Sequence, residues 1–342
     1  MIVTNDTPSS SGALSSGFLA RLAGKMRSAS SATRRDNAAL ISGDPAIVAS
    51  EADRLASTLS SLVLEAERIA TTVSAGLHGQ RRSGPGETFW QYRPALPGEP
   101  VTCIDWRQSA RSHKAYVRET EAEHAQTIYL WCDLSPSMIW SSQPSSLPLK
   151  RDRAILLLLA VASLLERSGE RVRLVSPNGR VDLPLGAGRI ASRIALALAS
   201  LAKQPDESTL LKGSALPPYS QLVIASDLLA PDREVTTLFR QLAGSGVRAH
   251  ILQIIDPAER DLPYSGRIRF EGLENEPDLI LPAVETLRPD YAGVFARRQT
   301  RLRTIAEGCR HTFQPHQTDT STASALLSLS ASLSGHRGGG RP

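Results

Sequence analysis

Short apolar runs alternate with amphipathic segments over the second half of the chain. Runs at 127–132, 221–225 and 247–255 are rich in β-branched residues and predict buried strands. Apolar residues at helical spacing predict helices at 150–168, 190–203 and 232–243. Alternation of strands and helices of this length predicts an α/β domain, with a mostly parallel sheet and helices on both faces.

Two local sequence patterns add detail to the predicted α/β domain. The longest apolar run, 154–165, lies between Arg153 and Glu166 and is shorter than the roughly 20 residues that span a bilayer, so it predicts a buried helix. Asn178-Gly179 is typical of a tight hairpin and joins two short predicted strands, 171–176 and 179–183.

The domain is predicted to extend over residues 127–334. Its last part contains two short strands, a basic helix, another strand and a final helix. These elements are predicted at 267–270, 279–281, 290–308, 311–314 and 320–334, and residues 335–342 form a disordered tail.

The part before residue 127 divides into three segments. Residues 1–45 are rich in Ser, Ala, Gly and Thr and predict a disordered leader, with a short amphipathic helix at 17–26 as the alternative. Residues 46–78 show helical spacing, and 79–126 predict a small β-rich segment with strands near 89–92 and 115–118.

Charge and cysteine content narrow the function classes. The 39 basic and 34 acidic residues are mixed along most of the chain, so the net charge of +5 indicates a solvated surface more than a nucleic-acid stripe. The same interpretation applies to four arginines of the predicted basic helix: Arg297, Arg298, Arg301 and Arg303. Three widely spaced cysteines predict neither a disulfide framework nor a zinc site, and with no signal-peptide pattern they favour the cytoplasm.

The most informative stretch is 127–138, TIYLWCDLSPSM. Its strand ends in the pattern D-x-S-x-S, formed by Asp133, Ser135 and Ser137. One carboxylate and two hydroxyls on a turn can converge on a hard cation such as Mg²⁺ or Mn²⁺. Ligands of open α/β sheets bind outside the carboxyl ends of strands, where this turn lies. Asp and Ser are also common turn formers, so an ordinary capped loop is the alternative.

A second informative stretch lies at 104–111, IDWRQSAR. It places Asp105 and Arg107 beside Trp106, a combination suited to an ion pair with a stacked guanidinium. The alternative is that Trp106 fills a surface crevice while the charges are solvated.

Together these motifs resemble the domain-of-unknown-function 58 family, bacterial proteins with a von Willebrand factor A-like domain that are often encoded beside MoxR-type AAA+ ATPases. The resemblance covers roughly 79–333. It rests on five segments in the expected order: Gly86–Glu99, Ile104–Arg111, Tyr116–Glu119, Asp133–Ser137 and Phe270–Glu274.

The resemblance implies a von Willebrand factor A-like, doubly wound sheet with a metal-ion-dependent adhesion site. Asp133, Ser135 and Ser137 would form its first loop, and Asp227 would supply its distal carboxylate. The threonine ligand would be Thr209, although its segment lacks the usual glycine; otherwise a water fills the position or the site is degenerate. The family signature would comprise Asp105, Trp106, Arg107, Ser109, Arg111 and Arg118.

The function implied is a non-enzymatic adaptor that binds a MoxR-type ATPase, and other von Willebrand A proteins, through a partner carboxylate that completes the metal shell. The alternative is a Mg²⁺-dependent phosphoryl-transfer enzyme with Asp133 as nucleophile. Such sites usually have a second carboxylate two residues on, where Ser135 stands, and the sequence contains no P-loop, G-x-S-x-G or H-E-x-x-H motif. No transmembrane helix and no nucleic-acid partner are expected.

Overall fold

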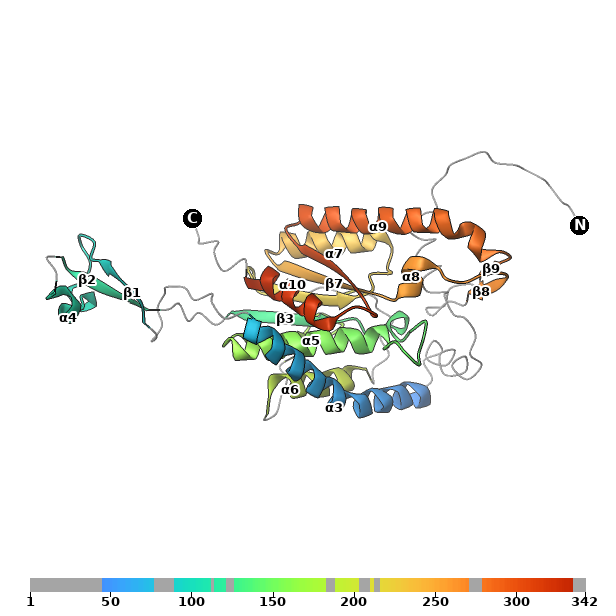
Figure 1. Cartoon of the computed structure of the whole chain (residues 1–342), viewed down its shortest axis with the longest axis horizontal. Coiled ribbons are helices and arrows are strands. Elements are labelled where there is room, and N and C mark those ends of the chain that lie inside the picture. The colour runs from blue at the N-terminus through green and yellow to red at the C-terminus, as the bar shows by residue number, and fades with distance from the viewer. Residues whose placement is uncertain are drawn as a thin grey trace, which may run out of the picture.

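A computed structural model describes residues 45–76, 89–111, 114–120, 126–182, 188–202, 210–211, 216–270 and 279–334. Figure 1 shows a sheet between two layers of helices, and a small β unit that includes β1 (Phe89–Pro94) and β2 (Tyr116–Thr120). The predicted leader, with its 17–26 helix, and the tail lie outside the described residues, as does most of the Phe270–Glu274 phrase.

The main sheet has six strands in the order β10-β7-β6-β3-β4-β5. Every neighbouring pair is parallel except β4–β5, which is the predicted Asn-Gly hairpin. The strands are β3 (Thr127–Cys132), β4 (Arg171–Val175), β5 (Val181–Asp182), β6 (Gln221–Ser226), β7 (Arg248–Ile255) and β10 (Thr312–Gln317). Counted along the chain this is the 3-2-1-4-5-6 order of a doubly wound fold. The doubly wound, mostly parallel α/β fold predicted from the sequence is confirmed.

The strand order reverses between β3 and β6, which lie side by side at the centre. Their register pairs Trp131 with Ile224 and Cys132 with Ala225. Both strands are almost wholly buried, which explains their near-continuous apolar sequences. Residues that follow the two strands therefore meet at the topological switch point, where doubly wound folds bind ligands.

Helices cover both faces of the sheet (Figure 1). One apolar core joins the first face to α3, α5, α6 and α10, and a second core joins the other face to α7 and α9. The helices are α3 (Pro45–Gly76), α5 (Lys150–Arg167), α6 (Ile190–Leu201), α7 (Asp232–Gly244), α9 (Arg288–Gly308) and α10 (Thr322–Ser334). The predicted helical segment 46–78 is thus part of the α/β body.

Helix α5 is buried around most of its circumference, including the whole run Ala154–Leu165. The sheet covers one side, and α3 and α6 pack on the other. This double cover explains why α5 has an apolar sequence without an exposed polar face. Ala66 and Ala70 of α3 are fully buried, which lets α3 approach closely.

A third apolar cluster lies beside the carboxyl ends of the strands. It joins Trp140, from the loop after β3, to Leu262, Phe270, Val284 and Tyr291. These residues belong to or adjoin α8 (Pro257–Asp261), β8 (Ile268–Phe270), β9 (Leu279–Leu281), the 3-10 turn Val284–Leu287 and the start of α9. The cluster anchors the loops that follow β3 and β7.

The small β unit is an antiparallel β1–β2 hairpin carrying the short helix α4 (Trp106–Ser109). Arg93 forms an ion pair with Glu99, which also accepts a hydrogen bond from the backbone of Leu96. Those bonds, with the salt bridge foremost, lower the pKa of Glu99 to about 2. The pair closes the Pro97-Gly98 turn, where Gly98 has φ 94°.

Leucine-to-alanine substitutions in α3 test its place in the core. Leu59 is 5% exposed, so Leu59→Ala should lower the free energy of unfolding by about 2–5 kcal/mol through loss of burial and a residual cavity. Leu64 of the same helix is 71% exposed, and Leu64→Ala should change it by no more than about 0.5 kcal/mol. Urea denaturation measures both. Equal effects would contradict the packing of α3 on α5.

His250 of β7 gives the sheet an acid-sensitive position. Its ring bonds Gln221 Oε1 at 3.1 Å and Thr312 Oγ1 at 3.0 Å, from the flanking strands. Burial, aided by Arg248 and His311, lowers the pKa of His250 from 6.5 to about 3. The folded chain therefore keeps this ring neutral where the unfolded chain protonates it.

Because the folded pKa is the lower one, His250 stabilises the fold above pH 6.5, and this stability is lost as the pH falls towards 3. In that window the residue should contribute a slope of about 1.4 kcal/mol per pH unit. His250→Gln, which keeps a polar amide at the site, should show a shallower loss of unfolding free energy between neutral pH and about pH 5. Identical slopes for the variant and the wild type would refute this role.

Candidate functional site

Four of the five residues predicted to form the metal site gather at one edge of the sheet, namely Asp133, Ser135, Ser137 and Asp227. We call this the carboxyl edge: residues 133–149 after β3, 227–231 after β6 and 256–261 after β7. Asp133 directly follows β3, and its backbone N–H still pairs with Ala225 at 2.9 Å. Its Oδ1 accepts from the Ser135 N–H at 2.9 Å and its Oδ2 from the Ser226 hydroxyl at 2.6 Å. Asp133 is fully buried.

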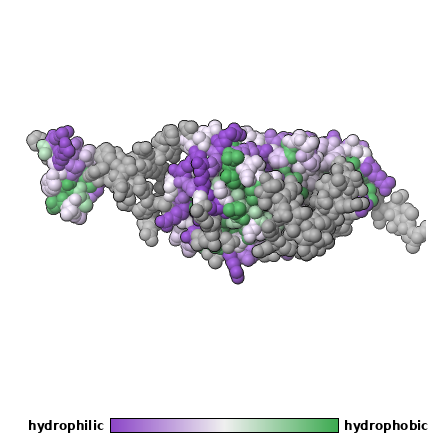
Figure 2. Space-filling model, turned by 90° about the horizontal axis from the view of Figure 1, so that it is seen from below, coloured by the Kyte–Doolittle hydropathy of each residue, from purple (hydrophilic) through white to green (hydrophobic). Residues whose placement is uncertain are grey.

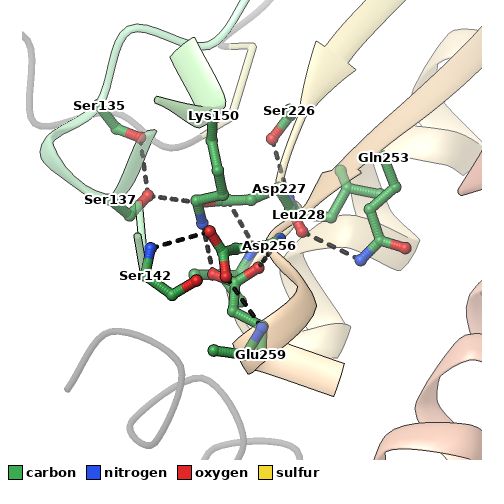
Figure 3. A network of polar contacts seen from close by, with 12 residues as sticks. Ser135, Ser137, Ser142, Lys150, Ser226, Asp227, Leu228, Gln253, Asp256 and Glu259 are labelled. Atoms are coloured by element: carbon green, nitrogen blue, oxygen red, sulfur yellow. Dashed lines mark hydrogen bonds and ion pairs between the residues drawn. The ribbon is translucent and has the colours of Figure 1, made fainter. Parts of the chain in front are cut away.

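The two serines of the D-x-S-x-S motif point toward Asp227 (Figure 3). Ser137 Oγ donates to Asp227 Oδ2 at 2.8 Å, and the Oγ atoms of Ser135 and Ser137 lie 3.1 Å apart. Pro136 begins a 3-10 turn that aims both hydroxyls inward. The structure therefore brings Asp133, Ser135, Ser137 and Asp227 together, while Thr209 lies outside the described residues.

A cation that sequence reasoning missed also reaches this cluster. Lys150, the first residue of α5, binds Asp227 Oδ2 at 2.9 Å and Glu259 Oε1 at 2.6 Å through its ammonium group. Lys150 is 1% exposed, and its ammonium lies 5.8 Å from the ring centre of Trp140. One buried ammonium thus links α5, the end of β6 and α8.

Helix α8 is held by a capping box. The Asp256 side chain accepts from the Ala258 N–H and Glu259 from the Asp256 N–H, each at 2.9 Å. Asp256 also accepts from the Ser142 N–H at 2.9 Å, which ties the loop after β3 to the start of α8. The sequence offered one signal for this contact, because Asp256-Pro257 ends a predicted strand.

Burial and charge shift the pKa values of the cluster. Burial, and then the neighbouring Asp227, raise the pKa of Asp133 to about 8. Burial also raises the pKa of Glu259 to about 7, although Lys150 opposes this. Burial disfavours the Lys150 ammonium, but Asp227 and Glu259 outweigh it and hold the Lys150 pKa above its usual value.

The oxygen donors are of the kind that Mg²⁺ or Mn²⁺ prefers, but their arrangement does not fit such an ion. Asp227 Oδ2, the oxygen that faces Ser137, already binds the Lys150 ammonium. Asp133, Ser135, Ser137 and Asp227 are each at most 2% exposed, so these four leave no open coordination position for a partner.

A cavity of about 20 Å³ adjoins the cluster and is lined in part by Asp227, Gln253, Glu259 and Tyr291. Gln253 Oε1 is buried there without a hydrogen-bond partner among the described residues, while its Nε2 donates to the Asp227 carbonyl at 3.1 Å. This space fits one water molecule and is too small for an organic substrate.

Residues 104–111, the family-signature segment, form hydrogen bonds within the small β unit. Asp105 is the N-cap of α4, accepting from the Gln108 N–H at 3.0 Å and from the Tyr92 hydroxyl at 3.1 Å. Ser109 Oγ donates to the Asp105 carbonyl at 2.7 Å and accepts from the Tyr116 N–H at 2.8 Å. These bonds brace α4 against the hairpin.

Trp106 is 61% exposed, so it does not fill a crevice among the described residues. Arg107 and Arg111 are exposed beside it, and the side chain of Arg118 lies outside the described parts. Figure 2 shows apolar surface next to strongly hydrophilic surface on this unit, and the exposed apolar residues include Leu96 and Val101.

One of the four clustered arginines has a structural role. Arg298 is buried, binds Asp232 Oδ1 at 3.1 Å and donates to the carbonyls of Leu228 and Ala230. Arg301 also pairs with Asp232, at 3.4 Å, from an exposed position. These contacts tie α9 to the segment after β6.

The strand order and the polar cluster at the switch point define a doubly wound α/β protein. The family model described as "Protein of unknown function DUF58" matches residues 91–301. The chain belongs to this family, as predicted.

Curated relatives include the uncharacterized proteins Mb1516 of Mycobacterium bovis and Rv1480 of Mycobacterium tuberculosis. Each is 24% identical over 303 residues, covering 83% of this chain and 93% of the relative.

Similar solved structures include an aerotolerance-related membrane protein from Bacteroides fragilis, with multiple mutations to serines, and the conserved hypothetical protein BatB from Bacteroides thetaiotaomicron. They are 12% and 11% identical with TM-scores of 0.31 and 0.32, and each match covers 62% of this chain and 100% of the other. Separately, none of the helices that the structure describes is both long and apolar enough to span a bilayer.

The Lys150–Asp227 pair can be tested by removing one partner. Asp227→Asn should lower the free energy of unfolding by about 3–5 kcal/mol, because it breaks a buried ion pair and disturbs the bond from Ser137. Asp261→Asn is a matched control at the exposed Arg260–Asp261 pair and should cost no more than about 1 kcal/mol. Urea denaturation compares the two. Similar small costs would show that the buried network does not hold the carboxyl edge.

Proposed function

We propose that the protein is a non-enzymatic interaction module that presents its carboxyl edge to a partner protein. The observation that carries this proposal is the state of Asp133, which is buried with both carboxylate oxygens accepting hydrogen bonds from the protein itself. A group held in this way positions the loop after β3 and is not available to a substrate.

The partner we propose is a MoxR-type AAA+ ATPase, with other von Willebrand A proteins as further partners. Membership of the DUF58 family supports this choice, since the family resemblance carries that association. The module would act as an adaptor in complex assembly or maturation. Its loops at the switch point lie where doubly wound folds bind their ligands.

The Mg²⁺ or Mn²⁺ ion implied by the resemblance stays a prediction. The residues expected to hold it are Asp133, Ser135, Ser137, Thr209 and Asp227, with a carboxylate of the partner completing its shell. The bond between Asp227 and the Lys150 ammonium favours an edge that works without this ion.

The alternative, phosphoryl transfer with Asp133 as nucleophile, has less support. A nucleophilic carboxylate needs an oxygen that can reach the phosphorus. Both Asp133 oxygens are bonded to Ser135 and Ser226, and the cavity nearby holds space for one water.

A pull-down tests the proposed partner. Tagged wild-type protein should capture a MoxR-type ATPase of its source organism equally in Mg²⁺ and in EDTA, with a non-hydrolysable nucleotide present in both. Asp133→Ala should weaken capture because it releases the loop that carries Ser135 and Ser137. The Leu64→Ala variant, altered at an exposed position of α3 that is not part of the carboxyl edge, should bind like wild type.

Three results would revise the proposal. Capture that is lost in EDTA even when nucleotide is omitted from both buffers would support the metal-bridged version. Capture that survives Asp133→Ala would move the contact to the exposed Trp106, Arg107 and Arg111 of the small β unit. No capture by folded wild-type protein would remove the ATPase as partner.

A further inference from the structure

Lys150 occupies a position that is unfavourable for a cation on two counts. It is the first residue of the 18-residue helix α5, where the helix dipole favours negative charge, and it is 1% exposed. Burying an ammonium costs several kcal/mol unless it is paired. Ion pairs with Asp227 and Glu259 offset both of these unfavourable terms. The two carboxylates therefore explain why a lysine can be buried at this position.

The ammonium does what a bound cation would do at this edge. It shares Asp227 Oδ2 with the Ser137 hydroxyl, and its other contact reaches Glu259 on α8. It thereby joins the ends of β3, β6 and β7 through one positive charge, as the close-up in Figure 3 shows. A divalent ion bound to Asp227 and the serines would have to share these oxygens with it.

We infer that the Lys150 ammonium takes the place of the divalent cation, so that the D-x-S-x-S edge of this chain is organised without a metal. The inference concerns the chain alone and does not depend on the ATPase or on any partner. It predicts a latent site: removal of the lysine charge frees Asp227 Oδ2, which lies against Ser137 and, through it, Ser135, for a hard divalent cation such as Mn²⁺ or Mg²⁺.

Mn²⁺ is the probe, because free Mn²⁺ gives an electron paramagnetic resonance signal that binding diminishes. Titrated wild-type protein should leave this signal at its protein-free level, and its unfolding temperature should be the same in Mn²⁺ and in EDTA. Lys150→Met should be less stable than wild type, should bind one Mn²⁺ per chain saturably, and should unfold at a higher temperature as Mn²⁺ is added.

Arg153→Met is the matched control. It also removes a positive charge from α5, but Arg153 bonds Thr318, which follows β10, and Thr322, which begins α10, and does not contact Asp227 in the described network. It should lose stability without gaining Mn²⁺ binding. The double variant Lys150→Met Asp227→Asn should lose the binding that Lys150→Met gains.

The Mn²⁺ titration of the wild-type protein tests the inference even if Lys150→Met fails to fold. Saturable Mn²⁺ binding by wild type that Asp227→Asn abolishes would overturn it. So would a folded Lys150→Met protein that binds no Mn²⁺, because the site would then have no cation-binding geometry. Lys150→Gln, which keeps a hydrogen-bond donor without the charge, is the second variant for the same test.

Discussion

The parallel pairing of β3 with β6 is the constraint on which the rest of this structure depends. These strands start the two halves of the doubly wound sheet, and their register places Cys132 against Ala225. The next residues along each strand direction, Asp133 and Ser226-Asp227, therefore meet at the same edge, and Asp133 bonds Ser226 directly. A polar cluster at this point is a consequence of topology, because the β3–β6 pairing brings together chain segments that are distant in sequence at the switch point.

Bringing carboxylates together in a buried place creates an electrostatic problem. Burial, and then the neighbouring Asp227, disfavour the charged form of Asp133. The carboxylates are stabilised by hydrogen bonds from Ser135, Ser137 and Ser226 and by the Lys150 ammonium. Removal of any one donor would leave a buried charge less well compensated, which explains why the network extends through three loops.

Much of the fold could be predicted from hydrophobic patterning, since buried strands and helices have clear periods. The 127–132 strand and the apolar helix near 150–168 were predicted to within a residue of β3 and α5. The D-x-S-x-S residues could be singled out because a local motif marks them, whereas Asp227 was assigned to the site by the family resemblance. Lys150 and Glu259 could not be found in this way. They are 109 residues apart, and each resembles an ordinary charged residue at a helix start.

The burial of α5 explains why Lys150 can hold its position. Because α3 and α6 cover the side of α5 that the sheet does not, the helix cannot rotate or slide without losing apolar contacts on several sides. Its first residue is therefore placed against Asp227 and Glu259 by packing that extends along the whole helix. A metal ion would have to be acquired from solution, whereas an ammonium placed by the core is present as soon as the chain has folded. The apolar core that holds α5 in place offsets the free energy of burying this charge, and it also fixes the loops of the carboxyl edge. Loops that are already fixed lose less conformational entropy when a partner binds.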